Sequence, residues 1–378
     1  MTSIQYHRTE PETIKSGGHT EFDNVDFVLA YPGRKIMLNS FRIIGNFQVQ
    51  QAGVILGDVD VRMDPNVGIH SCFESFNVKC DKYGQISSFS NYPRYVKSLR
   101  DATMSASDVG FSSQTVSELC AGDEATLKNM FYGYPPNNKT GAAAALSNEP
   151  LDFSFKPLIS INKARGETQI AYDDWGNIRV SVNLARAADC LYGPDMAADV
   201  SYLITNMRCI FKSVLDDGVK NKLPTILEPV ISNKQTVSSN FSNTSHRVPA
   251  VVSSFSSTFL LLSKENALKY NNLETNELPG LTQLQFLFQD STNQSITYTI
   301  KDRSEVISRY LESFKKTDTG DNQAKLMNLR SNGGYGIGLH FSEAIDLKNQ
   351  KFNAQFTTTI DSTNPYIMYS FFDTILEL

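Results

Sequence analysis

The sequence predicts an all-β protein built from two tandem antiparallel units of roughly eight strands each, with a few short helices. Three observations predict this fold class. Apolar and polar residues alternate along most segments from Asn24 onward. The chain contains 23 Phe and 16 Tyr but 1 Trp, an aromatic content that favours strands. A local pattern of strand, turn, strand and helix also occurs twice in the 378 residues.

Each copy of this repeated pattern begins at a glycine that opens an alternating strand. The first copy spans Gly68–Met104 and the second spans Gly280–Lys316. The same order of strands continues beyond both copies: segments 151–158, 178–186 and 200–214 correspond to 335–341, 352–360 and 366–378. Identity between the halves is low, so the match is one of pattern and order. It favours a structural duplication over a general all-β similarity.

The strands of the first half show one apolar face each. In Phe41–Gln50 the odd positions Phe41, Ile43, Phe47 and Val49 are apolar, while most even positions are polar. Segments 151–156 and 178–184 alternate in the same way. Burial of a single face is typical of antiparallel sandwiches and barrels and argues against a parallel sheet.

The second half repeats this alternation. Leu284, Phe286 and Phe288 alternate with glutamines, and apolar residues recur at every second position through most of segment 352–360. Two antiparallel units of similar size are therefore expected.

Two helices are expected at matching places. In the first, Pro93 occupies the first turn, and the apolar stripe comprises Tyr95, Val96, Leu99 and Ala102. In the second, Asp302 and Glu305 resemble a capping box, Lys315 and Lys316 suit the C-terminal end, and the stripe comprises Val306, Ile307, Tyr310, Leu311 and Phe314. Each helix is expected to pack on its own unit.

The domain division follows from breaks in the pattern. Residues 1–23 are polar and are expected to form a flexible N-terminal arm, ordered when a partner holds it. The first unit spans 24–216 and the second 217–378, with the turn-rich segment 215–225 as a linker. Residues 105–150 form an insertion that the second half lacks, and its loop 134–145 is expected to project from the surface.

Composition excludes several classes of protein. A net charge of -5 argues against a general nucleic-acid-coating surface. The most apolar segment, 248–262, is interrupted by serines and does not predict a membrane span. The N-terminus lacks the apolar region of a secretory signal, so synthesis in a cytoplasm is expected. The 5 cysteines share no metal-binding spacing and are expected to be buried apolar residues.

No motif in the sequence predicts catalysis. The 5 histidines are isolated along the chain, which argues against a metal enzyme. The stretch Gly333–Phe341 leads into an expected strand, so it fails as a phosphate-binding loop. Asp173 and Asp174 are better explained as a solvated hairpin tip than as paired catalytic carboxylates. We therefore predict no enzyme activity and no catalytic, cofactor-binding or metal-ligating residues.

The layout of residues 24–378 resembles the double jelly-roll major capsid proteins of tailless icosahedral double-stranded DNA viruses. This lineage includes adenovirus hexons, tectivirus-like phages, virophages and polinton-like viruses. The resemblance implies two eight-stranded jelly rolls, a virion location, and homotrimers of nearly hexagonal outline that tile an icosahedral shell. It implies contacts with neighbouring capsomers and with minor or vertex capsid proteins, and inner contacts of the arm with membrane or genome. It implies no cofactor and no small-molecule substrate.

Two alternatives remain open from the sequence. The pentameric vertex protein of the same kind of virus is a single jelly roll with a large added domain, and it predicts that the second half is not equivalent to the first. A carbohydrate-binding or adhesive β-sandwich protein predicts an exposed aromatic platform and a secretion route.

Overall fold

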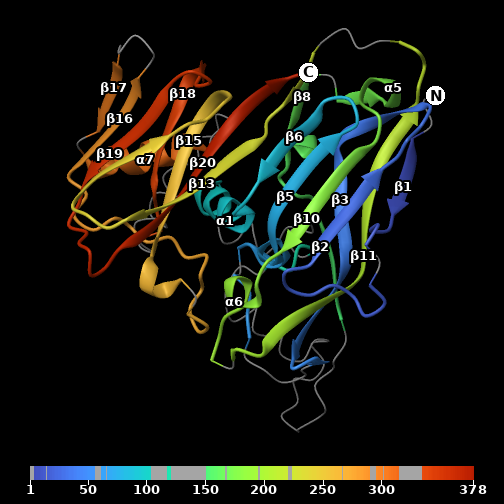
Figure 1. Ribbon diagram of the computed structural model, residues 1–378, viewed down its shortest axis with the longest axis horizontal. Helices are drawn as coiled ribbons and strands as arrows, with labels where there is room; N and C mark the ends of the chain where they lie inside the picture. The colour runs from blue at the N-terminus through green and yellow to red at the C-terminus, as the bar shows by residue number, and fades with distance from the viewer. Residues whose placement is uncertain are drawn as a thin grey trace.

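The chain folds into two β-sandwiches that stand side by side (Figure 1). The structure is a computed structural model. It describes residues 4–13, 15–55, 61–64, 66–103, 117–120, 150–166, 168–194, 196–219, 224–265, 267–289, 295–300, 302–314 and 334–378. In these ranges no helix combines the length and hydropathy that a membrane span requires.

The first sandwich, here the first roll, consists of two antiparallel sheets. One has the order β1-β11-β3-β4, and β7 and β9 also pair with β3; its strands are β1 (Gln5–Thr9), β3 (Arg34–Gln51), β4 (Val54–Ile55), β7 (Leu151–Phe155), β9 (Gln169–Ala171) and β11 (Val200–Leu215). The other has the order β2-β10-β5-β6, with strands β2 (Asn24–Leu29), β5 (Phe73–Cys80), β6 (Gly84–Phe89) and β10 (Ile178–Leu184).

The second sandwich, here the second roll, also consists of two antiparallel sheets. One has the order β18-β15-β20-β12-β8, with β13 also paired to β20; its strands are β8 (Ala164–Gly166), β12 (Thr225–Leu227), β13 (Val230–Val237), β15 (Val251–Leu261), β18 (Ile337–Asp346) and β20 (Tyr366–Glu377). The other has the order β14-β19-β16-β17, with strands β14 (Phe241–His246), β16 (Gln283–Gln289), β17 (Ser295–Ile300) and β19 (Lys351–Thr357).

Both rolls use one strand order. The sheet path β1-β11-β3-β7 in the first roll matches β13-β20-β15-β18 in the second, and β2-β10-β5-β6 matches β14-β19-β16-β17. Helix α1 (Tyr92–Thr103) follows β6, just as α7 (Arg303–Ser313) follows β17. Eight antiparallel strands in two facing sheets make each unit a jelly roll. The predicted duplication is confirmed, and the non-equivalent second half that the vertex-protein alternative requires is contradicted.

The predicted strand faces are confirmed by burial. Phe41, Ile43 and Phe47 of β3 are at most 2% exposed, whereas Arg42, Ile44 and Asn46 between them are half-buried. In the second roll, the rings of Phe255 and Phe352 pack at 4.6 Å between centroids, and Phe286 stacks on Phe352 at 5.8 Å. Alternation along each strand therefore sends one set of side chains into the space between the two sheets.

Several short elements differ from expectation. The segment containing Asp173 and Asp174 is a helical turn, α5 (Tyr172–Trp175), rather than a hairpin tip, because the buried Trp175 ring requires a turn that points it inward; both carboxylates are exposed, as expected. Three further single turns are η1 (Gly68–Cys72), η3 (Ser160–Asn162) and η4 (Leu262–Lys264), and α6 (Ala187–Cys190) follows β10.

The expected capping box at the start of α7 does not form. Asp302 is the N-cap residue but its side chain makes no capping hydrogen bond. Glu305 instead lies beside Arg309, 3.8 Å between Oε1 and Nε, one turn further along the helix. The i,i+4 attraction therefore takes the carboxylate away from the N-cap. Lys315 and Lys316 lie outside the described residues.

Parts of the expected arm and insertion can be placed. Gln5–Thr9 forms β1 along β11, a strand that the polar sequence did not indicate. His19 makes a further bridge to Ile204. Of the insertion 105–150, the structure describes 117–120 and Pro150, and the loop 134–145 lies outside the described residues.

Candidate functional site at the junction of the rolls

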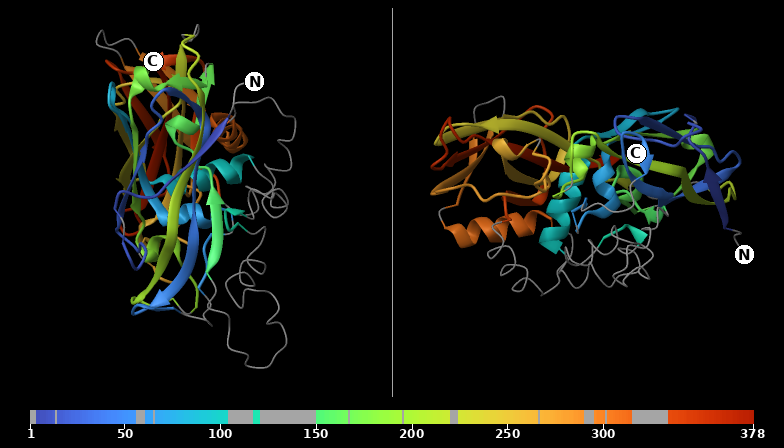
Figure 2. Two further views of the ribbon diagram at one scale, coloured as in Figure 1. Left: turned by 90° about the vertical axis from the view of Figure 1, so that its right-hand side faces the viewer. Right: turned by 90° about the horizontal axis from the view of Figure 1, so that it is seen from below.

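Helix α1 lies between the two rolls, whereas α7 packs mainly on β18 and β15 of the second roll (Figure 2). The sequence predicted that each helix would pack on its own roll; both helices do, and α1 in addition contacts the second roll. The reason is that α1 has two buried sides: Tyr92 and Val96 face the first roll, and Arg94 and Tyr95 reach residues of the second. The junction is thus built around a helix of the first roll.

A buried carboxylate anchors the centre of this junction. Asp373 of β20 accepts hydrogen bonds from the Tyr95 hydroxyl at 2.9 Å, from Lys163 Nζ at 2.7 Å and from Ser254 Oγ at 3.1 Å. Asp373 is 5% exposed. Because a buried carboxylate is stable only with such partners, the two rolls are held at one relative position here.

Aromatic rings pack around the same point. Tyr95 lies 5.5 Å from Phe371 and 5.3 Å from Phe89 between ring centroids, and Phe314 of the second roll lies 6.3 Å from Tyr95. Edge-on aromatic contacts of this kind add packing energy beyond the area they bury. The junction therefore resembles a protein core more than a flexible domain contact.

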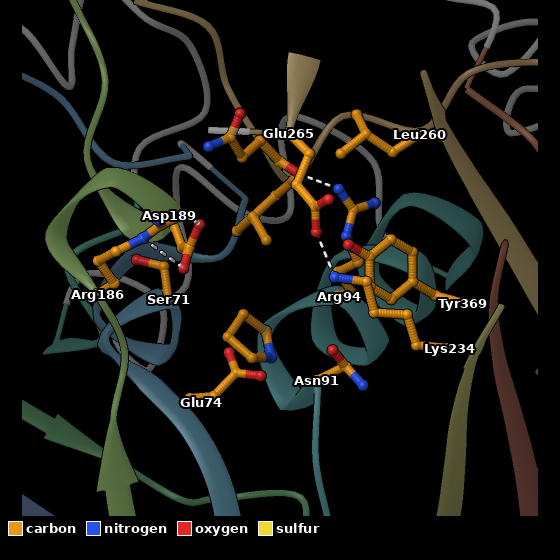
Figure 3. Close-up of a pocket in the computed structure, with 13 residues that line it drawn as sticks. Ser71, Glu74, Asn91, Arg94, Arg186, Asp189, Lys234, Leu260, Glu265 and Tyr369 are labelled. Carbon is orange, nitrogen blue, oxygen red and sulfur yellow. Dashed lines mark hydrogen bonds and ion pairs between the residues drawn. The ribbon is translucent and has the colours of Figure 1, made fainter. Parts of the chain in front are cut away.

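A polar cavity of about 250 Å³ lies beside this contact (Figure 3). Ser71, Glu74, Arg186 and Asp189 line it from the first roll, and Lys234, Glu265 and Tyr369 from the second. Two of the cationic side chains that line the cavity form ion pairs: Arg186 with Asp189 at 2.7 Å, and Lys234 with Glu265.

Arg94 crosses the junction at the wall of the cavity. Its guanidinium carbon lies 4.1 Å from the centre of the Tyr369 ring, and it donates to the backbone carbonyls of Asn272 and Glu274. Glu74 is in no ion pair within the described residues. Burial and the nearby Asp189 raise the pKa of Glu74 to about 7, against smaller opposing effects of the Asn91 amide, Lys234 and Arg94.

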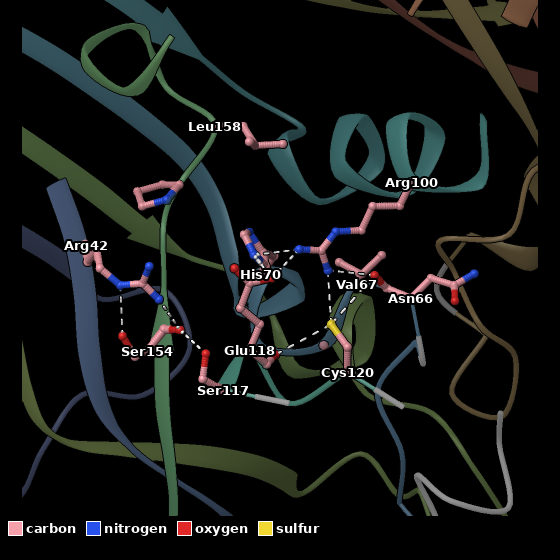
Figure 4. Close-up of polar contacts among 12 residues, drawn as sticks. Arg42, Asn66, Val67, His70, Arg100, Ser117, Glu118, Cys120, Ser154 and Leu158 are labelled. Carbon is pink, nitrogen blue, oxygen red and sulfur yellow. Dashed lines mark hydrogen bonds and ion pairs between the residues drawn. The ribbon is translucent and has the colours of Figure 1, made fainter. Parts of the chain in front are cut away.

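A second buried polar cluster holds residues 117–120 of the insertion to α1 (Figure 4). Arg100 of α1 pairs with Glu118 and donates to the Asn66 carbonyl at 2.7 Å. His70 Nε2 lies 3.3 Å from the same Glu118 carboxylate, and its Nδ1 lies 2.5 Å from the Tyr92 hydroxyl. Burial opposes the ionisation of Glu118, but His70 and Arg100 outweigh it and lower the pKa of Glu118 to about 2.

The residues that the sequence offered as candidates for catalysis or metal binding lie apart from one another in the structure. The five histidines lie in separate places: His7 against Phe211, His19 near Asp23, His70 beside Glu118, His246 in the aromatic core of the second roll, and His340 exposed on β18. Within the described residues, no group of three or more His, Cys, Asp or Glu side chains is arranged to hold a metal ion. Exposed aromatic side chains are likewise spread over separate segments: Tyr6, Phe22, Tyr83, Phe241 and Tyr270.

Sequence reasoning missed the polar residues of the junction. Arg94 and Arg100 are 6% and 8% exposed, although arginine on a short helix predicts a solvated face. Tyr92, Tyr95 and Val96 follow the i, i+3, i+4 spacing of a single helix face, so the sequence carried no sign that Arg94 and Arg100 are buried beside them.

Comparison with known proteins reveals a shared fold. No protein-family model matches the sequence, and no curated protein matches it. The structure of the Faustovirus major capsid protein matches with a TM-score of 0.60 at 10% identity, over 100% of this chain and 90% of that chain. PBCV-1 VP54, in a crystal structure fitted into a reconstruction of the virophage Sputnik, matches with a TM-score of 0.56 at 11% identity, over 100% and 95%. The mavirus major capsid protein matches with a TM-score of 0.51 at 10% identity, over 98% and 87%. The chain has the double jelly-roll fold along its full length.

Proposed function

We propose that this double jelly-roll chain is the major capsid protein of an icosahedral virus and that three copies form its capsomer. The full-length likeness to the Faustovirus and mavirus major capsid proteins supports the fold of such a subunit. The observation that carries the proposal is a difference between the two rolls: one sheet face is covered in the second roll, and the equivalent face is open in the first.

The covered face belongs to β13, β20 and β15. Its outward side chains include Ser256, Tyr369 and Phe371, which are 4%, 5% and 1% exposed. They are buried because β6 and α1 of the first roll lie over them: Phe89 meets Phe371 at 6.5 Å between ring centroids, and Ser90 Oγ lies 2.9 Å from Ser232 Oγ.

The open face belongs to the equivalent strands β1, β11 and β3. Tyr6 is 65% exposed and Ile4, two residues before it on the same side of the chain, is 52% exposed. Tyr6 pairs across the strands with Lys212, whose Nζ lies 5.1 Å from the ring centre. The second roll has the matching pair, Lys234 opposite Tyr369 at 5.5 Å, and there Arg94 covers the ring.

A head-to-tail contact between similar units leaves one complementary face free at each end. The same contact can form again between neighbouring copies. The series of rolls closes into a ring when the rotation from one roll to the next is a whole-number fraction of 360°. We infer that the β17 and α7 side of one copy covers the Tyr6 face of the next. Six rolls from three chains then surround one axis, which gives a nearly hexagonal trimer.

The proposal extends to the organisation of the chain. We assign residues 24–216 to the first roll, which β1 completes, 217–378 to the second roll, whose sheet β8 extends, and 105–150 to a projection on the first roll. In the arm 1–23, β1 belongs to the sheet of the first roll and the rest of the arm contacts neighbours, membrane or genome, in a virion whose other partners are adjacent capsomers and minor or vertex proteins. The rigid junction supports this assignment, because a shell subunit must keep one shape under lateral contact.

The size of the purified protein in solution tests the proposal. We expect a stable trimer of three times 42.1 kDa by light scattering or native mass spectrometry. A charge placed on the open face, Tyr6→Asp, should convert trimer to monomer without changing the circular dichroism spectrum. Tyr83→Asp, at a tyrosine that is 52% exposed on the β5–β6 turn, is the matched control and should remain trimeric. A monodisperse pentamer or a monomeric parent protein would contradict the trimer.

A further inference from the structure

Two cysteine side chains of the first roll lie in contact. Cys72 ends η1 and Cys190 ends α6, and their sulfur atoms are 4.0 Å apart. Both thiols are free, and the residues are 0% and 3% exposed. The other three cysteines, all described, have different neighbours: Cys80 Sγ accepts from the Tyr83 amide, Cys120 lies beside Arg100, and Cys209 lies in β11 opposite Ile43.

The backbone on both sides of the pair is fixed. Phe73, next to Cys72, pairs with Leu184 at the end of β10, after a shift in register between Asn183 and Leu184. The Ala185 amide donates to the Cys72 carbonyl at 2.9 Å, and the Leu191 amide donates to the Ala187 carbonyl at 2.8 Å around Cys190. A disulfide has an S–S length of about 2.05 Å, so side-chain rotation must close a gap of about 2 Å.

We propose that Cys72 and Cys190 are a redox pair, a dithiol in a reducing cytoplasm and a disulfide once the protein reaches an oxidising medium. The biological setting rests on the proposed function, since a virion leaves the cell that makes its subunits. The oxidant is a small disulfide of the oxidised glutathione class. The thiolate of one cysteine attacks it and releases one glutathione thiolate; the other cysteine then attacks the mixed disulfide and releases the second. The protein loses two electrons and two protons, and the glutathione disulfide becomes two thiols.

The environment of the pair makes this oxidation slow. Burial and the neighbouring Cys72 thiol raise the pKa of Cys190 well above its usual range. The thiolate, which is the attacking form, is therefore scarce at neutral pH and becomes more abundant as the pH rises. The junction cavity is lined by Ser71 and Asp189, the chain neighbours of the two cysteines, but not by the cysteines themselves, so an oxidant reaches the thiols only when this region opens locally.

The disulfide would tie the two ends of a long segment of the first roll. Residues 72–190 include β5, β6, α1 and β10 together with the insertion. Cross-links that close long segments restrict the unfolded chain and stabilise the folded one. We expect oxidation to raise the melting temperature by roughly 5–10 °C.

The experiment treats the full-length protein with oxidised glutathione at pH 7 and pH 8.5 and maps its peptides by mass spectrometry without reduction. We expect a Cys72–Cys190 peptide that lacks two hydrogens, faster formation at pH 8.5, and a rise in melting temperature that dithiothreitol reverses. Cys190→Ser should abolish the rise, and Cys209→Ser should retain it.

Peptide mapping of the parent protein does not depend on whether either variant folds. Five free thiols after prolonged oxidation, or cross-links at other cysteines, would overturn the inference. The assembly state is read separately: a trimer with five free thiols refutes the redox pair alone, whereas a disulfide-bonded monomer refutes the capsomer alone.

Discussion

Two acidic side chains at the junction differ in how many hydrogen-bond and ion-pair partners they have. Asp373 has three hydrogen-bond donors, two of them from the other roll. Glu74 faces the neighbouring cavity, has no ion pair within the described residues, and has a pKa raised to about 7 by burial and by Asp189. The first carboxylate stabilises the contact between the rolls, whereas ionisation of the second opposes it.

We predict that Glu74→Gln stabilises the protein at alkaline pH. The folded pKa of about 7 exceeds the ordinary value of 4.5, so ionised Glu74 costs stability as the pH rises between these values. At pH 8 the free energy of unfolding should increase by about 1–3 kcal/mol in the variant, and at pH 4 the two proteins should agree. Urea denaturation across this range measures the effect.

Glu343→Gln, at an exposed position of β18, is the control and should leave the pH dependence of the parent unchanged. If Glu74→Gln has the same pH dependence as the parent, another group titrates in this range.

Strand β18 shows why the glycine-rich stretch before it has its composition. A Cβ atom on Gly336 would lie 1.8 Å from the Ser257 carbonyl oxygen of β15, and one on Gly338 would lie 2.5 Å from Ser313 Oγ of α7. The strand therefore enters a space bounded by a neighbouring backbone and a helix. As expected, the stretch leads into a strand, and Gly336 and Gly338 permit close packing there.

Gly336→Ala should destabilise the second roll. The added methyl group meets backbone, which cannot move without loss of the β15–β18 pairing, so we expect a loss of about 2–4 kcal/mol in the free energy of unfolding. Gly17→Ala provides the matched control, because nothing lies within 4 Å of the added atom. Chemical denaturation of both variants measures the difference, and a neutral Gly336→Ala would show that β18 can shift away from β15.

At the scale of the whole molecule, the junction makes the two rolls one body. Tyr95 contributes both a hydrogen bond to Asp373 and ring contacts to Phe89, Phe371 and Phe314. A further contact joins the rolls on the other side of α1, where Lys97 lies 3.2 Å from Asp64 and Asn271 of the second roll donates to the same carboxylate at 2.5 Å.

We predict that the rolls unfold together in the parent protein and separately in Tyr95→Ala. Loss of the ring leaves a cavity and removes one hydrogen bond to the buried Asp373, a combined cost of about 3–5 kcal/mol at the junction. Scanning calorimetry should show one transition for the parent and two for the variant. Tyr95→Phe, which keeps the ring, should have a calorimetric profile closer to that of the parent. Tyr83→Ala, on the surface, should have the same profile as the parent. A single unshifted transition for Tyr95→Ala would place the coupling elsewhere.

The sequence by itself determined the strand faces, the duplicated order and the places of the two main helices. Each depends on residues within a few positions of one another, as in the alternation of Phe41, Ile43 and Phe47, so a local pattern suffices to predict it. The sequence therefore indicated two similar antiparallel units before any contact between them was known.

The tertiary structure alone decided how these units meet. The pairing of β1 with β11, the passage of Arg94 across the junction and the contact of Cys72 with Cys190 each join residues more than a hundred positions apart. A polar strand, a helical arginine and an isolated cysteine carry no local sign of such partners. Their burial is set by the surfaces that close around them, which exist only after both rolls have folded.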